Sequence, residues 1–221
     1  MITSSKITVF ILISWLALLS GCATSRSVID IPLPISESSR TSKNKYVYIN
    51  SVNDKRIFEV APTEPNLPSL DPSEKNGSDI QLRAIGRKRG GSGIAWGDIV
   101  LPEGKTVESL INAALRASFI DNGYEVITTK SKITNETYIV DANIIKFWSW
   151  MNPGFFELRL STEISTNIII KNKDEIDNFV ISVKKTDSFQ AGTDSSWLQV
   201  IEEAFNNYLN EVKNSNHLRI F

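Results

Sequence analysis

Apolar side chains recur with a helical spacing in two stretches of the chain. After Thr106 they fall at every third or fourth position until Gly123, which is the spacing of an amphipathic helix. Thr106 is a preferred N-cap residue, and Gly123 is placed to end the helix at C′. A second stripe begins after Asp194 or Ser195 and continues to Val212. The pattern therefore predicts two helices, one in the middle of the chain and one near its end.

Elsewhere apolar and polar residues alternate, which is the pattern of half-buried strands. The alternating or β-branched segments begin at Lys45, Tyr124, Tyr138, Phe156 and Phe179. In the third the phase slips near Ile144, which predicts a β-bulge, and in the fourth Phe156 and Leu158 fall on the apolar face. Because most strands follow one another between two helices, we expect an α+β fold. It would have an antiparallel or mixed sheet of about four to five strands, with the two helices packed on one face.

The N-terminus has the layout of a secretory signal peptide. Lys6 precedes an apolar run over residues 7–19, and Ser20 and Gly21 are the small residues before Cys22, the only cysteine. A cysteine at the first mature position is the signature of a bacterial lipoprotein, whose thiol takes a diacylglyceryl group and whose new amino group is acylated. The apolar run is shorter than the roughly 20 residues that a transmembrane helix needs.

This interpretation predicts the location of the protein. A lone cysteine is more often a buried structural residue, but not at the end of such an apolar run. Ala23 follows Cys22, whereas Asp at that position is the usual inner-membrane retention signal. We therefore expect a lipid anchor in the outer membrane of a Gram-negative cell, with the protein on the periplasmic face.

Composition divides the chain into three parts, the last of which contains an insertion. Residues 1–21 are the signal peptide, and 22–44 form a Ser- and Thr-rich lipidated tether whose apolar positions allow it to dock in part. Residues 45–221 form a single α+β domain. Within it, about 58–104 is an insertion rich in Pro and Gly, in which regular structure should be short.

The mature chain carries few groups suited to catalysis. Without Lys6 it has 23 basic and 25 acidic residues, a net charge of −2, which argues against general nucleic-acid binding. No cysteine remains for a disulfide or zinc once Cys22 is acylated, and the only histidine, His217, is most simply a surface residue. We expect no enzyme activity, no metal and no cofactor apart from the covalent lipid.

With this element order the chain resembles the YajG-type lipoproteins, a family of proteobacterial envelope proteins. The matching motifs are Gly21-Cys22-Ala23, the stretch from Ile29 to Pro34, Asp54-Lys55-Arg56, Asn122-Gly123-Tyr124 and Phe189-Gln190-Ala191. The chain departs from the family pattern in the insertion. The resemblance implies an α+β domain on an outer-membrane anchor, and no enzymatic activity is attached to the family.

The insertion contains the candidate binding residues Arg83, Arg87, Lys88 and Arg89, the last three among glycines. Such a loop is suited to phosphate or carboxylate groups of lipid headgroups, lipopolysaccharide or an acidic protein. It is not a P-loop, because Ser92 stands where that motif needs Lys. The alternative is a solvated loop whose charges stay in water.

Two further groups of residues have open roles. Trp148 and Trp150 precede Asn152-Pro153-Gly154, so they are either core residues or exposed aromatics of a hairpin tip. Asp54 and Arg56 are placed to form an ion pair after the first strand. We expect an outer-membrane lipoprotein that acts as an accessory or interaction module with an envelope protein partner. The alternative is a lipid- or glycan-handling component of an envelope transport system, and the oligomeric state is left open.

Overall fold

The structure is a computed structural model that describes residues 26–36, 44–74, 77–89, 93–173 and 175–220. The signal segment and Cys22 lie outside these residues. Among the described helices, none has the length and apolar character needed to cross a bilayer.

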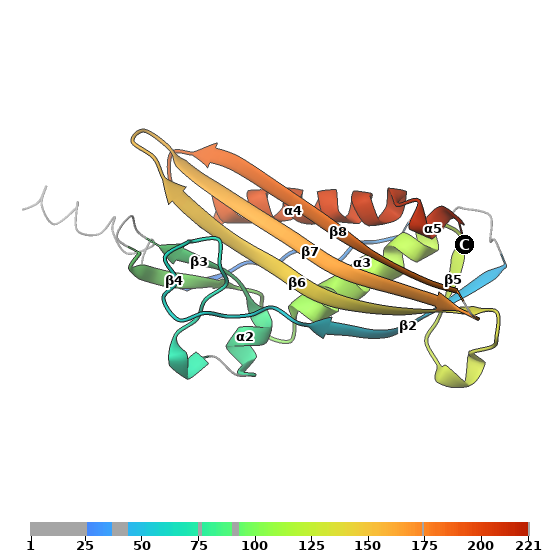
Figure 1. The fold of residues 1–221 in the computed structure, drawn as a ribbon. Coiled ribbons are helices and arrows are strands. Elements are labelled where there is room, and N and C mark those ends of the chain that lie inside the picture. Colours follow the sequence, from blue (N-terminus) through green and yellow to red (C-terminus); the bar gives the residue numbers. More distant parts are fainter. Residues whose placement is uncertain (1–25, 37–43, 75–76, 90–92, 174, 221) are drawn as a thin grey trace, which may run out of the picture.

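Three long antiparallel strands form one side of the sheet (Figure 1). They are β6 (Thr137–Pro153), β7 (Leu158–Asn172) and β8 (Glu175–Phe189). The register between β6 and β7 shifts between Ile144 and Lys146, which confirms the predicted bulge. The three successive strands expected between the helices are thereby confirmed.

Five more strands are added along the other edge of β6, and several pair in parallel. β2 (Lys45–Asp54) runs parallel to the first half of β6, and β5 (Tyr124–Ile127) runs parallel to β2. The second half of β6 meets β3 (Ala84–Arg89), with Gly86 opposite Ser149. β4 (Ala95–Val100) is antiparallel to β3, and β1 (Ser27–Val28) is parallel to β4.

The mixed sheet therefore has eight strands among the described residues, and the expected four to five is wrong. The difference lies mainly in β3 and β4, inside the segment interpreted as an irregular insertion. Glycines and basic residues interrupt their apolar pattern, so period-two alternation is not visible there.

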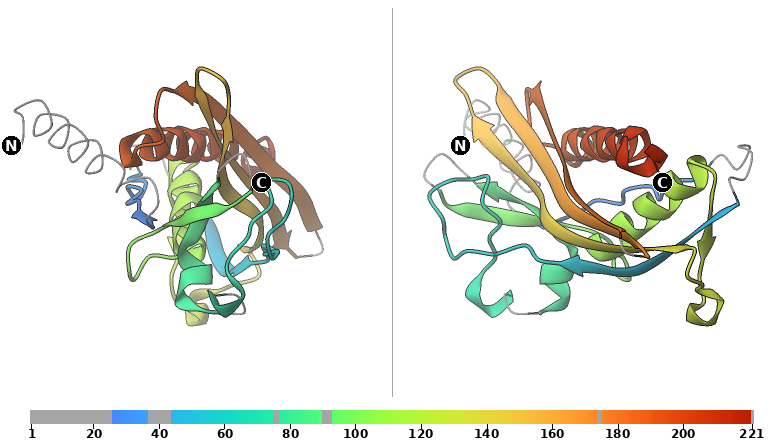
Figure 2. Two further views of the ribbon diagram at one scale, coloured as in Figure 1. Left: turned by 90° about the vertical axis from the view of Figure 1, so that its left-hand side faces the viewer. Right: turned by 45° about the vertical axis from the view of Figure 1, so that its right-hand side comes forward.

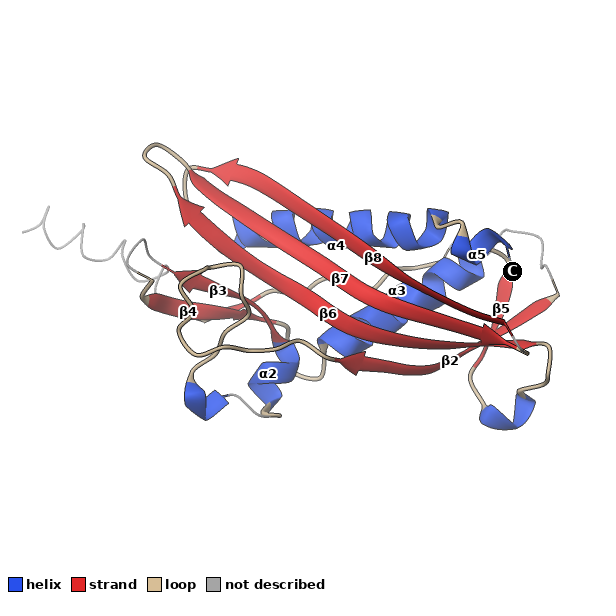
Figure 3. Ribbon diagram, in the orientation of Figure 1, coloured by secondary structure: helices blue, strands red, loops and turns tan. Residues whose placement is uncertain are grey.

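The two predicted helices, α3 (Val107–Asp121) and α4 (Asp194–Asn214), contact each other on one face of the sheet (Figures 2 and 3). Thr106 caps α3 in a reciprocal capping box with Ser109, and Gly123 follows its C-cap with φ +85°. α4 starts slightly earlier than expected, because its N-cap is Thr193. The helix count was too low: the structure adds α2 (Asp79–Arg83), α5 (His217–Ile220) and two 3₁₀ turns, η1 (Pro72–Glu74) and η2 (Lys130–Lys132).

The bulge in β6 lets the sheet bury apolar residues on both faces. We call the layer under α3 and α4 the main core; after the bulge it receives Phe147, whose ring lies 6.4 Å from that of Phe205 in α4. The neighbouring Trp148 points to the opposite face. There it belongs to a smaller cluster, the loop core, which consists of Phe58, Leu70, Ala84, Val100, Trp148 and Trp150. Residues 57–70, the covering loop, close this side.

The segment before residue 45 takes part in the fold. Ile29 and Ile31 are buried in the main core, and the Ile29 backbone N–H donates to the Val100 carbonyl at 2.9 Å. Partial docking of the tether is thus confirmed.

Candidate functional site

The candidate basic residues lie in a strand and not in an exposed loop. Arg87, Lys88 and Arg89 belong to β3, Arg83 ends α2, and none of the four is more than 7% exposed. The expectation of side chains presented to water is therefore wrong. Strand alternation decides the direction of each side chain: Arg87 and Arg89 contact the covering-loop side, and Lys88 contacts the start of α4.

Each buried cation has partners within the chain. Arg83 donates to Asp79 and to the Leu101 carbonyl, both at 2.8 Å. Arg87 pairs with Asp71, and its Nε lies 3.3 Å from an Asp98 oxygen. Charges that are buried without partners are very costly, so these contacts explain how the fold tolerates the cluster.

The remaining two cations join distant segments. Lys88 Nζ donates to the Ser27 hydroxyl at 2.6 Å, and that hydroxyl donates to Asp194 in the first turn of α4. Arg89 donates to the Pro62 carbonyl at 2.6 Å and to the Ser69 hydroxyl. Lys88 and Arg89 thus tie the N-terminal segment, the covering loop and α4 to β3.

Asp98 is the buried acid of this network. Burial raises the pKa of its carboxyl group, against the opposing effects of a hydrogen bond from Arg26 at 3.1 Å and the positive charge of Arg87. An external anion would have to displace such internal partners. Anion binding by these residues stays a prediction.

Trp148 and Trp150 are core residues, with 0% and 4% of their surface exposed. The Trp148 ring meets Phe58 edge to face at 5.9 Å, and its indole N–H donates to the Pro65 carbonyl at 3.2 Å. The exposed-aromatic alternative is wrong for this pair, because the covering loop packs on Trp148 and the Lys146 and Lys184 side chains lie over the Trp150 ring. The predicted ion pair between Asp54 and Arg56 is confirmed at 2.7 Å.

The exposed aromatics are instead Phe155 and Phe156, which are 91% and 84% exposed. β6 ends at Pro153 and β7 begins at Leu158, so both phenylalanines lie in the connecting turn. The expectation that Phe156 faces inward is wrong for that reason. The sequence feature that favours their exposure is their position directly after Pro153-Gly154, where a turn is favoured.

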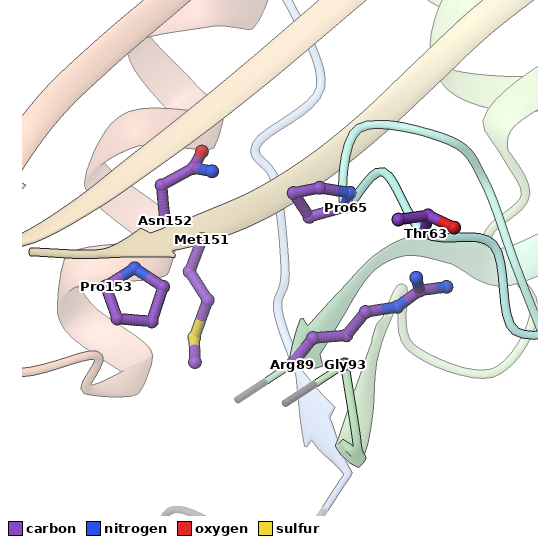
Figure 4. A pocket seen from close by; sticks show the side chains of 7 residues that line it. All are labelled: Thr63, Pro65, Arg89, Gly93, Met151, Asn152 and Pro153. Carbon is purple, nitrogen blue, oxygen red and sulfur yellow. The ribbon is translucent and has the colours of Figure 1, made fainter. Parts of the chain in front are cut away.

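Two hollows lie beside this turn. One, of about 280 Å³, is lined by Thr63, Pro65, Arg89, Gly93, Met151, Asn152 and Pro153. Figure 4 shows the Arg89 side chain directed toward Thr63, with Met151 and Pro153 on the other side. The second, of about 200 Å³, is lined by Lys88, Trp96, Met151, Pro153, Leu158, Gly192 and Trp197. Since Met151 and Pro153 line both hollows, the two belong to one region, the hairpin end, which comprises residues 93–96, the 153–158 turn and the start of α4.

The second hollow has the character of a small apolar binding site. Its walls are mainly hydrophobic, with the Lys88 side chain at one side. The indole N–H of Trp197 is buried and has no hydrogen-bond partner among the described residues. Over the same residues, no group of three or more His, Cys, Asp and Glu is close enough to hold a metal ion.

His217 is half-exposed, as expected for a surface residue, but it is also packed. Its ring stacks on Phe179 at 4.0 Å, and its Nδ1 lies 2.5 Å from an Asp177 oxygen. These contacts dock the C-terminal turn against the start of β8, at the end of the sheet opposite the hairpin end.

No family model and no curated protein matches the sequence. Among solved structures, an uncharacterized protein is similar over 88% of this chain and 99% of its own, with 7% identity and a TM-score of 0.48. A Xanthomonas campestris protein of the DUF330 family is similar over 88% of this chain and 94% of its own, with 12% identity and a TM-score of 0.42. A likeness at this level assigns no function.

Proposed function

We propose that this protein is a triacylated outer-membrane lipoprotein of the YajG type that faces the periplasm. It acts as a non-enzymatic accessory or interaction module of the cell envelope, with an envelope protein as partner. The observation that carries the proposal is Cys22, placed behind an apolar run and Leu19-Ser20-Gly21 and followed by Ala23.

The fold is compatible with this role. Ser27 is already paired with β4, so few residues separate Cys22 from the packed body. Stable anchoring by acyl chains needs two or more of them, and a triacylated cysteine provides three. A short connection then holds the domain against the membrane surface without a spanning segment.

Metabolic labelling with palmitate tests the anchor. The wild-type protein should incorporate label and fractionate with membranes, whereas Cys22→Ser should do neither, because the thiol that takes the diacylglyceryl group is gone. Ser20→Ala, which keeps a small residue before the cysteine, is the matched control and should label normally. Equal labelling of wild type and Cys22→Ser would refute the proposal.

The choice of membrane has its own test. Ala23→Asp introduces the usual inner-membrane retention signal and should move the labelled protein from the outer to the inner membrane fraction. Palmitate incorporation should stay unchanged, which separates location from lipidation. An Ala23→Asp protein that stays in the outer membrane would contradict the proposed sorting.

The second candidate function is lipid or glycan handling in an envelope transport system, and the apolar hollow of the hairpin end favours it. A Cβ added to Gly192 would lie 2.9 Å from a Leu158 methyl and 3.6 Å from the Trp197 indole nitrogen. Gly192→Ala should therefore narrow the hollow. If phospholipid copurifies with wild type and is lost from this variant, lipid handling is supported; a defined protein partner without bound lipid supports the first function.

A further inference from the structure

The hairpin end carries a concentration of exposed apolar side chains. Phe155 and Phe156 are joined there by Ile94, which is 63% exposed, and by Trp96, which is 40% exposed. Trp96 and Pro153 line the same hollow, and Gly93 and Pro153 line the other, so these residues border one surface. Figure 1 shows the β6–β7 turn and the start of β4 at the same end of the molecule.

The turn holds the two phenylalanines outward. The Gly154 backbone N–H donates to the Glu157 carbonyl at 2.8 Å, which closes a tight loop around them. Their rings contact each other edge to face at 4.6 Å. Because the turn is closed by its own backbone, the aromatic pair projects from the end of the sheet without folding back onto it.

The N-terminal segment approaches this same end. β1 is parallel to β4 with Ser27 opposite Ile99, and Arg26 donates to Asp98 at 3.1 Å, so the described chain enters the fold on the Trp96 side of Ile99. Ser27 also accepts a hydrogen bond from Lys88, which lines the hollow that contains Trp96. Three residues lie between Cys22 and Arg26, and the four residue steps of an extended chain span at most about 14 Å.

We infer that the hairpin end contacts the lipid bilayer in which the acyl chains of Cys22 are embedded, with Phe155 and Phe156 inserted at the interface. This inference rests on the proposed lipidation. Aromatic side chains favour the boundary between headgroups and acyl chains, and apolar side chains gain free energy by leaving water there. The short connection brings this end, and not the opposite one, to the membrane.

Charge at this end also favours a lipid surface over a charged protein partner. Arg159, next to the turn, pairs with Glu157 at 2.8 Å. Among the cations of β3, Arg87 and Lys88 pair with acids inside the fold, and Arg89 donates to the Pro62 carbonyl and the Ser69 hydroxyl. The patch is thus mainly apolar, and it is suited to a bilayer interface.

Site-specific labelling of the acylated full-length protein tests the contact. The chain has only one cysteine, and acylation consumes its thiol, so Phe155→Cys or Phe156→Cys provides the only reactive group. Ile176→Cys is the matched control, because Ile176 is 69% exposed and lies at the start of β8, at the opposite end of the sheet. Each variant carries an environment-sensitive fluorophore and is reconstituted into vesicles of phosphatidylethanolamine and phosphatidylglycerol that contain nitroxide-labelled lipid.

We expect lipid-borne nitroxide to quench the labels at 155 and 156 severalfold more strongly than the label at 176. Equal, weak quenching at all three positions would overturn the inference while palmitate incorporation still supports the lipoprotein. Shielding of the 155 label without quenching would show that a protein or a second copy covers the patch, and would also overturn it. Reaction of the fluorophore with the wild-type chain would reveal a free Cys22 thiol and would refute the lipoprotein proposal itself.

A second variant separates insertion from mere proximity. Phe155→Ser and Phe156→Ser together, with the label at Ile94→Cys, should reduce quenching at position 94 severalfold relative to the same label with both phenylalanines present. The melting temperature should not change, because both rings are exposed in the fold. Unchanged quenching would show that the phenylalanines do not hold this end in the bilayer.

Discussion

The main core and the loop core lie on opposite faces of the same strand, and they are closed in different ways. The main core is a continuous apolar layer between the sheet and two long helices. The loop core has six buried apolar residues, and buried cations surround it: Arg56, Arg83, Arg87 and Arg89. A small apolar cluster buries little surface, and a network of hydrogen bonds and ion pairs between distant segments completes this side of the sheet.

Arg56 shows how this network works. Its guanidinium group binds Asp54 and donates to the carbonyls of Gln81, Ala84 and Phe147, from 2.5 to 3.1 Å. It also lies 5.0 Å from the centre of the Phe58 ring. One side chain therefore joins the strand β2, the segment around α2 and the strand β6.

Apart from Lys88, which faces the start of α4, the main core contains pairs of neutral polar groups. The Thr166 and Tyr208 hydroxyls lie 2.8 Å apart, and those of Ser149 and Thr162 lie 2.9 Å apart. Burial raises the pKa of Tyr208 well above its usual value. Loss of such a pair should cost less than loss of a buried ion pair.

The largest effect is expected from the combined change Arg87→Ala, Lys88→Ala and Arg89→Ala. Breaking one buried ion pair costs about 3–5 kcal/mol, and a typical domain has a stability of about 5–15 kcal/mol. The variant should therefore unfold or melt at much lower temperature. Circular dichroism melting measures this.

The matched control for this change is Lys130→Ala with Lys132→Ala, which removes exposed cations. It should alter the free energy of unfolding by no more than about 0.5 kcal/mol. If both variants melted like wild type, the buried network would have no role in stability, and an anion-binding role for these residues would regain support.

Neighbouring truncations in β6 compare the two cores directly. Phe147→Ala removes a ring from the main core, and Trp148→Ala removes one from the loop core; each should cost about 3–5 kcal/mol. Hydrogen exchange distinguishes them. Trp148→Ala should expose the amides of β3 and β4 while α3 and α4 stay protected, whereas Phe147→Ala should reduce protection throughout. Identical exchange patterns would show that the two cores unfold as one unit.

Gly86→Ala should have an intermediate effect. An added Cβ would lie 2.7 Å from the Ser149 carbonyl oxygen, so β3 and β6 would have to separate where they pair. We expect a loss of about 1–3 kcal/mol, the cost of inserting a methyl group into a packed interior. Urea denaturation measures it, with Gly192→Ala as a control outside this strand pair. A midpoint equal to that of wild type would show that the pairing is dispensable.

The smallest effect is expected at alkaline pH, where ionisation of the buried Tyr124 lowers the stability of the main core. Burial, with a contribution from Tyr138, raises the pKa of Tyr124 to about 12. The folded-state pKa exceeds the usual value of about 10. The stability gained from burying the neutral Tyr124 side chain is therefore complete below pH 10 and is lost as the pH rises toward 12. Tyr124→Phe cannot ionise, so it should lose less stability than wild type across that interval, by at most about 1–2 kcal/mol. Urea midpoints at pH 8 and pH 11 measure this difference, and equal losses would contradict it.

Elements defined by local pattern could be predicted from the sequence. The helix from Val107 and the helix from Asp194 follow from apolar spacing and capping residues, and the bulge near Ile144 follows from a change in alternation. The role of Phe155 and Phe156 could not be predicted in the same way, because continued alternation and a turn both fit their sequence. Only the positions at which β6 ends and β7 begins distinguish the two.

The sequence by itself determined the long helices, the central strands and the predicted lipid anchor, because each depends on residues that are close neighbours along the chain. Tertiary structure decided the position of the cations of β3, which are buried because their partners, Asp71, Asp98 and Asp194, come from other segments. It also decided which aromatics are exposed, since the covering loop packs on Trp148 and two lysine side chains lie over Trp150, whereas Phe155 and Phe156 in the β6–β7 turn stay exposed. Burial of a charge or an aromatic ring depends on contacts between distant segments, and composition and periodicity contain no record of them.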